Sequence, residues 1–83
     1  MTILFTGRKA DLTPALKAFA EGKLAKLERI LDDIQEAHVI LELDKHRHRC
    51  ETVLKARTAT LTARADGPDF RVSIARCADR LLA

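Results

Sequence analysis

Aromatic residues, glycine, proline and long apolar runs are all scarce in this chain of 83 residues. It has no tryptophan or tyrosine, two prolines and three glycines, and its longest apolar runs span three residues. This composition, with 47% hydrophobic and 33% charged residues, argues against disorder, collagen and low complexity. A spanning helix needs roughly 20 apolar residues, so no membrane segment is predicted. We expect a single domain, residues 1–83, with a thin core.

Cysteine is also sparse, because only Cys50 and Cys77 are present. No secretory signal pattern accompanies them, so two reduced thiols in a cytoplasmic protein are predicted in preference to a disulfide. One thiol is expected in a strand and the other on the buried stripe of the last helix. Each would act there as a small hydrophobic residue that binds no metal.

Charged residues follow one another in blocks, although fifteen Lys and Arg against twelve Asp and Glu give a net charge of only +3. Residues 1–31 carry +3, residues 32–44 carry −5, residues 45–64 carry +5, and residues 65–83 are balanced. A folded domain built this way can present a basic surface to a polyanion while its acids face elsewhere. Nucleic acid is therefore the favoured partner class, and an ordinary solvated surface is the alternative.

Hydrophobic periodicity predicts an α+β domain with the order β-α-β-β-β-α. Its elements are strands at Thr2–Thr6, 38–44, Cys50–Arg57 and Thr60–Ala65, and helices at about 14–31 and from Phe70 onward. The strand-helix-strand start implies a parallel pair, and the later short links imply antiparallel hairpins. The prediction is a four-stranded mixed sheet with two helices on one face and a half-polar face on the other.

Local signals place the ends of these elements. Thr13 followed by Pro14 predicts a helix start, and Asp69 can cap the last helix. Gly7 predicts a turn after the first strand, and the acidic pair Asp32–Asp33 predicts another after the first helix. The buried stripe of the first helix is expected to include Leu16, Phe19, Ala20, Leu24, Leu27, Ile30 and Leu31, and the other two phenylalanines are also assigned to the core.

Gly22 lies inside the predicted first helix, where glycine costs up to about 1 kcal/mol relative to alanine. Either packing compensates for this cost, or a close approach requires glycine.

Catalytic and metal-binding patterns are weak. His46, His48 and Cys50 alternate in one segment and are of ligand type, but no fourth ligand follows and the interleaved bases would repel a cation. The three glycines are far apart, which excludes a phosphate-binding loop. No nucleophile with an orienting carboxylate is indicated by spacing. We therefore predict neither an enzyme nor a cofactor.

A basic stripe on the first helix is more informative. Lys23, Lys26 and Arg29 recur every three residues beside the apolar stripe. Such a row can lie along phosphates, and it can also be ordinary solvated surface. Because the chain lacks the aromatic platform that readers of single strands use, recognition of the backbone and shape of structured RNA is favoured over base readout.

Several motifs at consistent spacing, in register up to about Asp69, resemble one family. They are Thr6-Gly7-Arg8, Leu12-Thr13-x-Ala15-Leu16, Lys23-Leu24-x-Lys26-Leu27-Glu28-Arg29, Glu42-x-Asp44-Lys45-His46-Arg47-His48 and Ala59-Thr60-Leu61-x-Ala63-Arg64. The chain resembles the short form of the ribosome hibernation-promoting factors, also called the ribosome-associated inhibitor or sigma-54 modulation protein family. The resemblance implies a fold similar to a double-stranded-RNA-binding domain. It also implies binding to the small ribosomal subunit and its rRNA in the mRNA and tRNA channel, with inhibition of translation under stress.

Carried over by resemblance, seven residues are expected to face ribosomal RNA: Arg8, Lys23, Lys26, Arg29, His46, Arg47 and Arg80. The last helix departs from the family pattern, since only Arg80 matches a family base and the basic tail and the dimerisation domain of long forms are not seen. The alternatives are a truncated chain, a shortened relative with weaker ribosome affinity, or an anion surface moved to Arg71 and Arg76.

The sheet face opposite the helices is expected to bring Leu4, Ile40 and Val53 together. A contiguous apolar patch often marks a partner surface, and an edge strand offers unpaired backbone groups. A weak homodimer through this face, with residual RNA affinity, is the alternative function. A lone solvated patch is the simpler interpretation.

Overall fold

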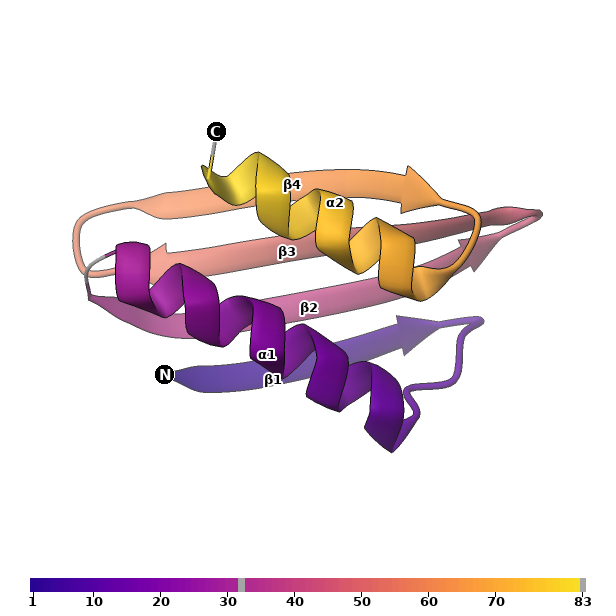
Figure 1. The fold of residues 1–83 in the computed structure, drawn as a ribbon, viewed down its shortest axis with the longest axis horizontal. Coiled ribbons are helices and arrows are strands. Elements are labelled where there is room, and N and C mark those ends of the chain that lie inside the picture. The colour runs from indigo at the N-terminus through magenta and orange to yellow at the C-terminus, as the bar shows by residue number, and fades with distance from the viewer. Residues whose placement is uncertain (32, 83) are drawn as a thin grey trace.

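The computed structural model describes residues 1–31 and 33–82. It has the predicted α+β architecture, and its six elements follow the predicted order (Figure 1). They are β1 (Thr2–Arg8), α1 (Pro14–Ile30), β2 (Ile34–Asp44), β3 (Arg47–Ala56), β4 (Thr60–Gly67) and α2 (Phe70–Leu82). The predicted turn at Asp32–Asp33 is described only at Asp33, because Asp32 and Ala83 lie outside the described residues.

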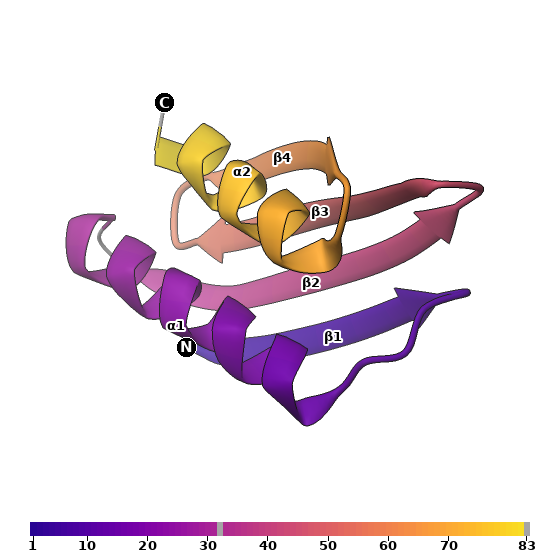
Figure 2. The same cartoon turned by 45° about the vertical axis from the view of Figure 1, so that its right-hand side comes forward.

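The four strands form one sheet in the order β1-β2-β3-β4. β1 and β2 run parallel, and the other neighbours run antiparallel, as predicted. Both helices cover the same face, α1 on the side of β1 and β2 and α2 over β3 and β4 (Figures 1 and 2). The opposite face of the sheet, here called the open face, has no helix over it in the described part of the chain. β1 and β4 are the edge strands.

The core lies between the sheet and the helices. It is built from alternate residues of the strands and from the inner stripes of both helices: Ala20, Leu24, Leu27, Ile34, Ala37, Val39, Leu41, Cys50, Leu54, Ala63, Ala65, Ile74, Cys77 and Leu81. Phe5, Phe19 and Phe70 pack at its margin and are only partly buried. The prediction for Ile30 is wrong, because its side chain is 63% exposed and Leu31, the helix C-cap, is the residue that packs on the core.

Several element boundaries differ from prediction, among them the end of β4, which lies at Gly67 instead of Ala65. β1 continues through Gly7 to Arg8, and the left-handed residue of the following loop is Lys9, with φ 55°. Gly7 is required by a close approach instead, since a Cβ there would lie 2.5 Å from the Ala10 carbonyl oxygen. β2 begins at Ile34 instead of residue 38, and β3 begins at Arg47, so the basic interruption shrinks to a two-residue loop. Hydrophobic alternation misses the start of β3 because Arg47 and Arg49 are charged, and it misses the start of β2 because the register shifts between Ile34 and Glu36.

Both predicted caps are confirmed. The Thr13 hydroxyl accepts a hydrogen bond from the Leu16 amide at 3.2 Å, and the Asp69 carboxylate accepts one from the Val72 amide at 2.9 Å. No close approach requires Gly22, because an added Cβ would meet no atom within 4 Å. That packing of the helix compensates for its cost stays a prediction. No described helix combines the length and apolar character that crossing a membrane requires.

Candidate nucleic-acid interface

The positive charge of the folded domain is concentrated in its helical layer. The two helices carry seven basic and three acidic side chains, whereas the four strands carry five of each. The helical layer therefore has a charge of +4 and the sheet is neutral. The helical bases are Lys17, Lys23, Lys26 and Arg29 on α1, and Arg71, Arg76 and Arg80 on α2.

The sheet is neutral because the acidic and basic blocks of the sequence pair across β2 and β3. The antiparallel register sets Glu36 opposite Lys55 and Glu42 opposite Arg49. Their charged atoms lie 3.3 Å and 3.7 Å apart. The predicted basic surface from residues 45–64 is thus largely neutralised by the acids that precede it.

The helical bases differ from the sheet bases in this respect. Within residues 1–31 and 33–82, none of the seven lies within 4 Å of a carboxylate. Of the predicted α1 stripe, Lys26 and Arg29 are exposed, and Lys23 is half-buried. These charges are available to an anionic partner without first breaking an ion pair.

Phe19 links the basic surfaces of the two helices. The Lys23 ammonium nitrogen lies 5.5 Å from the centroid of the Phe19 ring, and the Arg71 guanidinium carbon lies 5.1 Å from it. Cations are attracted to the face of an aromatic ring at such distances. One half-buried ring therefore contacts a base from α1 and a base from α2.

The structure does not gather all the predicted RNA-binding residues into one patch. Arg8 ends β1 in register with Glu42, and it lines a hollow of the open face together with Ile40 and Glu42. His46 lies in the β2–β3 hairpin loop, and Arg47 begins β3. This hairpin projects from the end of the sheet that is far from the C-terminal end of α1 (Figure 1). The rim residues and the α1 stripe are two separate basic regions.

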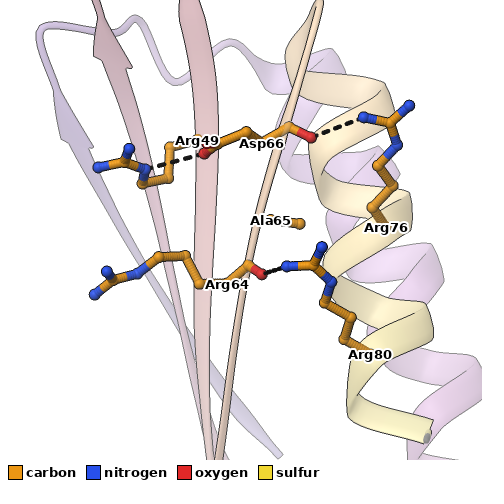
Figure 3. A pocket seen from close by; sticks show the side chains of 6 residues that line it. All are labelled: Arg49, Arg64, Ala65, Asp66, Arg76 and Arg80. Atoms are coloured by element: carbon orange, nitrogen blue, oxygen red, sulfur yellow. Dashed lines mark hydrogen bonds and ion pairs between the residues drawn. The ribbon is translucent and has the colours of Figure 1, made fainter.

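Arg80 belongs to a third region, which we call the β4-edge cluster: Arg49, Arg64, Asp66, Arg76 and Arg80. The Arg76 side chain donates a hydrogen bond to the Asp66 carbonyl oxygen at 2.9 Å, and Arg80 donates to the Arg64 carbonyl oxygen (Figure 3). The cluster lines an open hollow of about 470 Å³. Two arginines of α2 thus lie along the backbone of an edge strand.

Of the β4-edge cluster, only Arg80 is among the seven residues predicted to bind RNA. Arg49 and Arg64 were outside that set, and Arg76 entered only in an alternative with Arg71. The structure places these two residues on different surfaces, because Arg71 faces Phe19 on the α1 side and Arg76 reaches β4. The four-residue spacing of Arg76 and Arg80 was the available signal, since such residues lie on one face of a helix. Their position over β4 follows only from the docking of α2.

The side chains of His46, His48 and Cys50, which alternate in the sequence, lie in different surroundings. His46 lies in the hairpin loop, whereas the ring of His48 packs edge-on against Phe70, with centroids 4.7 Å apart. Cys50 is fully buried in β3. In the described residues, no group of three His, Cys, Asp or Glu side chains is placed to hold a metal ion.

The two thiols meet in the core, in the predicted strand and on the predicted helical stripe. Cys77 donates to the Thr52 hydroxyl at 3.4 Å, and the Cys50 sulfur lies 3.7 Å from the same oxygen. The hydrogen bond to Cys77, together with burial, raises the pKa of the Cys50 thiol. Cys50 therefore remains a neutral, unreactive thiol.

The apolar residues of the open face are not contiguous. Leu4 and Val53 lie on either side of His38 in the register, and Ile40 lies two residues further along β2. His38 hydrogen-bonds the Thr6 hydroxyl at 2.7 Å. Leu4 is 45% exposed, while Ile40 and Val53 are half-buried. The predicted cluster is interrupted by a polar pair, and the predicted dimer through it remains a prediction.

Comparison with known proteins identifies the family. Residues 3–83 match the family described as sigma 54 modulation protein / S30EA ribosomal protein. The chain belongs to this family. It is 32% identical over 81 residues to the ribosome hibernation promoting factor of Escherichia coli, covering 98% of this chain and 85% of that one. The factor of Azotobacter vinelandii is also 32% identical, with 98% of this chain and 76% of the relative covered.

Two solved structures share the fold. A ribosomal subunit interface protein from Coxiella burnetii superposes with a TM-score of 0.91 and 27% identity, covering 98% of this chain and 89% of that one. The N-terminal domain of Thermus thermophilus Protein Y gives 0.90 and 30%, covering 98% of this chain and 91% of the other. The resemblance drawn from the motifs is confirmed.

Proposed function

We propose that this chain is a ribosome hibernation factor that binds the small ribosomal subunit and blocks the channel used by mRNA and tRNA. It would act in the cytoplasm and inhibit translation under stress. The observation that carries the proposal is the helical layer of charge +4, without carboxylate partners in the described residues, in a chain whose relatives are named ribosome hibernation promoting factors.

The α1 stripe is the proposed principal contact. Lys23, Lys26 and Arg29 would lie along the sugar-phosphate backbone of rRNA, releasing counterions as they neutralise phosphates. Arg71 would extend this contact to α2 because it lies over the same Phe19 ring as Lys23. Contacts of this kind position a protein on structured RNA without reading its sequence.

The rim residues and Arg80 are proposed as further contacts. Arg8, His46 and Arg47 lie at one end of a domain whose longest dimension is 36 Å, away from the α1 stripe. A partner that touches all of these residues must be large and enclosing. An RNA-lined channel meets that requirement, and occupying it blocks translation without any catalytic step.

Co-sedimentation with purified small ribosomal subunits tests the proposal. The chain should pellet with subunits at about 50 mM KCl and be progressively released towards 200 mM, as expected for phosphate contacts. Added mRNA and tRNA should compete with it, and it should inhibit cell-free translation in proportion to its occupancy of the subunits. Absence of binding at every salt concentration would reject the proposal. Binding without competition would reject the channel location alone.

A further inference from the structure

The two outer edges of the sheet differ in how their backbone groups are covered. β4 pairs only with β3, and Arg76 and Arg80 of α2 donate to carbonyl oxygens of β4 (Figure 3). β1 pairs only with β2. Within residues 1–31 and 33–82, no hydrogen bond other than those of its ladder with β2 reaches the backbone of β1. The edge of β4 is therefore covered by side chains, whereas the edge of β1 is bare.

β1 also lacks the features that usually prevent an edge strand from pairing with another chain. Such features include charged side chains, proline, a bulge and a covering segment. The segment Thr2–Thr6 contains no charged residue and no proline, and its register with β2 is unbroken. The loop after β1 lies beside the carboxyl end of the strand (Figure 1), where a Cβ at Gly7 would lie 2.5 Å from the Ala10 carbonyl oxygen. Thr2–Thr6 precedes this covered end.

The sequence of this bare segment is symmetric in residue type. Threonine stands at both ends, a large apolar residue lies next to each threonine, and Leu4 is at the centre. Antiparallel pairing of two copies about Leu4 sets Thr2 opposite Thr6. The same register sets Ile3 opposite Phe5. Threonine pairs and pairs of an aromatic with a β-branched residue are among the cross-strand pairs that stabilise antiparallel sheets. The segment therefore complements a second copy of itself.

The burial of these side chains agrees with this register. Leu4 points to the open face and is 45% exposed, whereas Ile3 and Phe5 pack on the margin of the core and are only partly buried. Residues directly opposite each other in an antiparallel pair share a face of the sheet. Pairing would therefore cover Leu4 with Leu4 of the second copy, and Ile3 with Phe5. Apolar surface that the single chain leaves in water would be buried.

We propose that β1 is a self-association edge, at which a second copy of this chain pairs antiparallel through Thr2–Thr6. The two four-stranded sheets would join into one continuous sheet, with both helical layers on the same side. A strand pair this short makes a small interface, so the contact is weak and transient. It differs from the dimer predicted through the open face, and it does not depend on ribosome binding.

Engineered disulfides test the register directly. Thr2→Cys and Thr6→Cys chains, mixed under mild oxidation, should link to each other far faster than either links to itself. Opposite Cβ atoms lie about 5 Å apart, close to the span of a disulfide. Leu4→Cys should link to itself. Leu61→Cys changes another exposed leucine, on the opposite edge strand, and should not link. Equal rates for all combinations would indicate random collision and overturn the proposal.

Hydrogen exchange of the wild-type chain tests the edge without any substitution. Some amides of Thr2–Thr6 should exchange more slowly at about 1 mM than at about 20 μM, because pairing occupies their outward N–H groups. The amides of β4 should exchange at the same rate at both concentrations. Exchange of β1 that does not depend on concentration would overturn the proposal.

Variants separate edge pairing from association through the open face. Leu4→Lys sets two ammonium groups directly opposite each other, so it should remove the concentration dependence of exchange in β1. The matched change on the other edge, Leu61→Lys, should leave it intact. Ile40→Thr, on β2, should also leave it intact. Loss of the dependence in Ile40→Thr but not in Leu4→Lys would assign association to the open face and overturn the proposal. If Leu4→Lys does not fold, exchange of the wild type still decides.

Discussion

The Lys55 ammonium of β3 lies 3.3 Å from the Glu36 carboxylate of β2, directly opposite it in the antiparallel register. These two residues belong to sequence blocks of opposite charge. Strand pairing brings the two blocks together, so that their charges offset each other. The strands together carry no net charge, and the net positive charge belongs to the helices. The basic surface is thus decided by strand register as much as by composition.

Charge reversal on α1 should abolish ribosome binding. Lys23→Glu/Lys26→Glu/Arg29→Glu removes three bases that make no ion pair within the described residues, so the fold should persist. The salt slope should fall by about 3 or more, and co-sedimentation with small subunits should be lost. Undiminished sedimentation of a folded triple variant would show that the stripe is only solvated surface.

A milder pair of variants controls for net charge. Lys26→Gln/Arg29→Gln and Lys55→Gln/Arg57→Gln each remove one lysine and one arginine. The second pair breaks the exposed ion pairs with Glu36 and Asp33, which should cost at most about 1 kcal/mol each. Only the α1 pair should weaken binding to subunits. Equal weakening by both would indicate a nonspecific response to net charge.

Gly22→Ala should stabilise the domain. Position 22 lies inside α1 and is exposed, and a Cβ there meets nothing within 4 Å. Alanine should therefore contribute about 1 kcal/mol, raising Tm by about 4–8 °C in a domain of this size. Gly67→Ala is the contrasting variant, because its Cβ would lie 3.0 Å from the Ser73 amide nitrogen, and it should lower Tm.

The two cysteines should form no disulfide and bind no metal, although they lie close together around Thr52. Intact-mass measurement of purified protein should give the fully reduced value, and metal analysis should give no stoichiometric zinc. Alanine at either position should be tolerated with a loss of about 1 kcal/mol, the value of a small buried group. A mass two units lower would contradict the prediction.

Stability should fall in alkaline solution because of Cys50. Its pKa is raised in the folded state by the Cys77 hydrogen bond and by burial, so the folded chain retains the proton after the unfolded chain has lost it. The contribution is complete below the ordinary thiol pKa of about 9 and is lost as pH rises above it. Urea unfolding at successive pH values should show this decline in the wild type and a smaller one in Cys50→Ala. Parallel curves would assign the decline to other groups.

The hypothesis of self-association through the open face can be tested separately from ribosome binding. Replacing Leu4 and Ile40 with threonine keeps β-propensity, so it should convert any dimer to monomer without changing ribosome binding. Analytical ultracentrifugation of the wild type and of Leu4→Thr/Ile40→Thr measures this. A wild-type chain that is already monomeric at high micromolar concentration would refute the hypothesis.

The sequence by itself determined the order of elements and the family. Period-two and helical spacing are local consequences of backbone geometry, so the strands, both helices and the caps at Thr13 and Asp69 were predictable. The α1 stripe was also predictable, since residues three apart share a helix surface. Motif spacing was enough to assign the family because the whole domain matches in register.

Only the tertiary structure decided which charges remain available. Arg49 and Lys55 appear basic in the sequence but are neutralised by acids that the register sets opposite them. Arg76 and Arg80 become a row along β4 only because α2 docks over that strand. Such relationships join residues seven or more positions apart, and no local period encodes them. Strand pairing and helix docking decide these contacts, and both are driven by burial of the core that the sheet and the helices share.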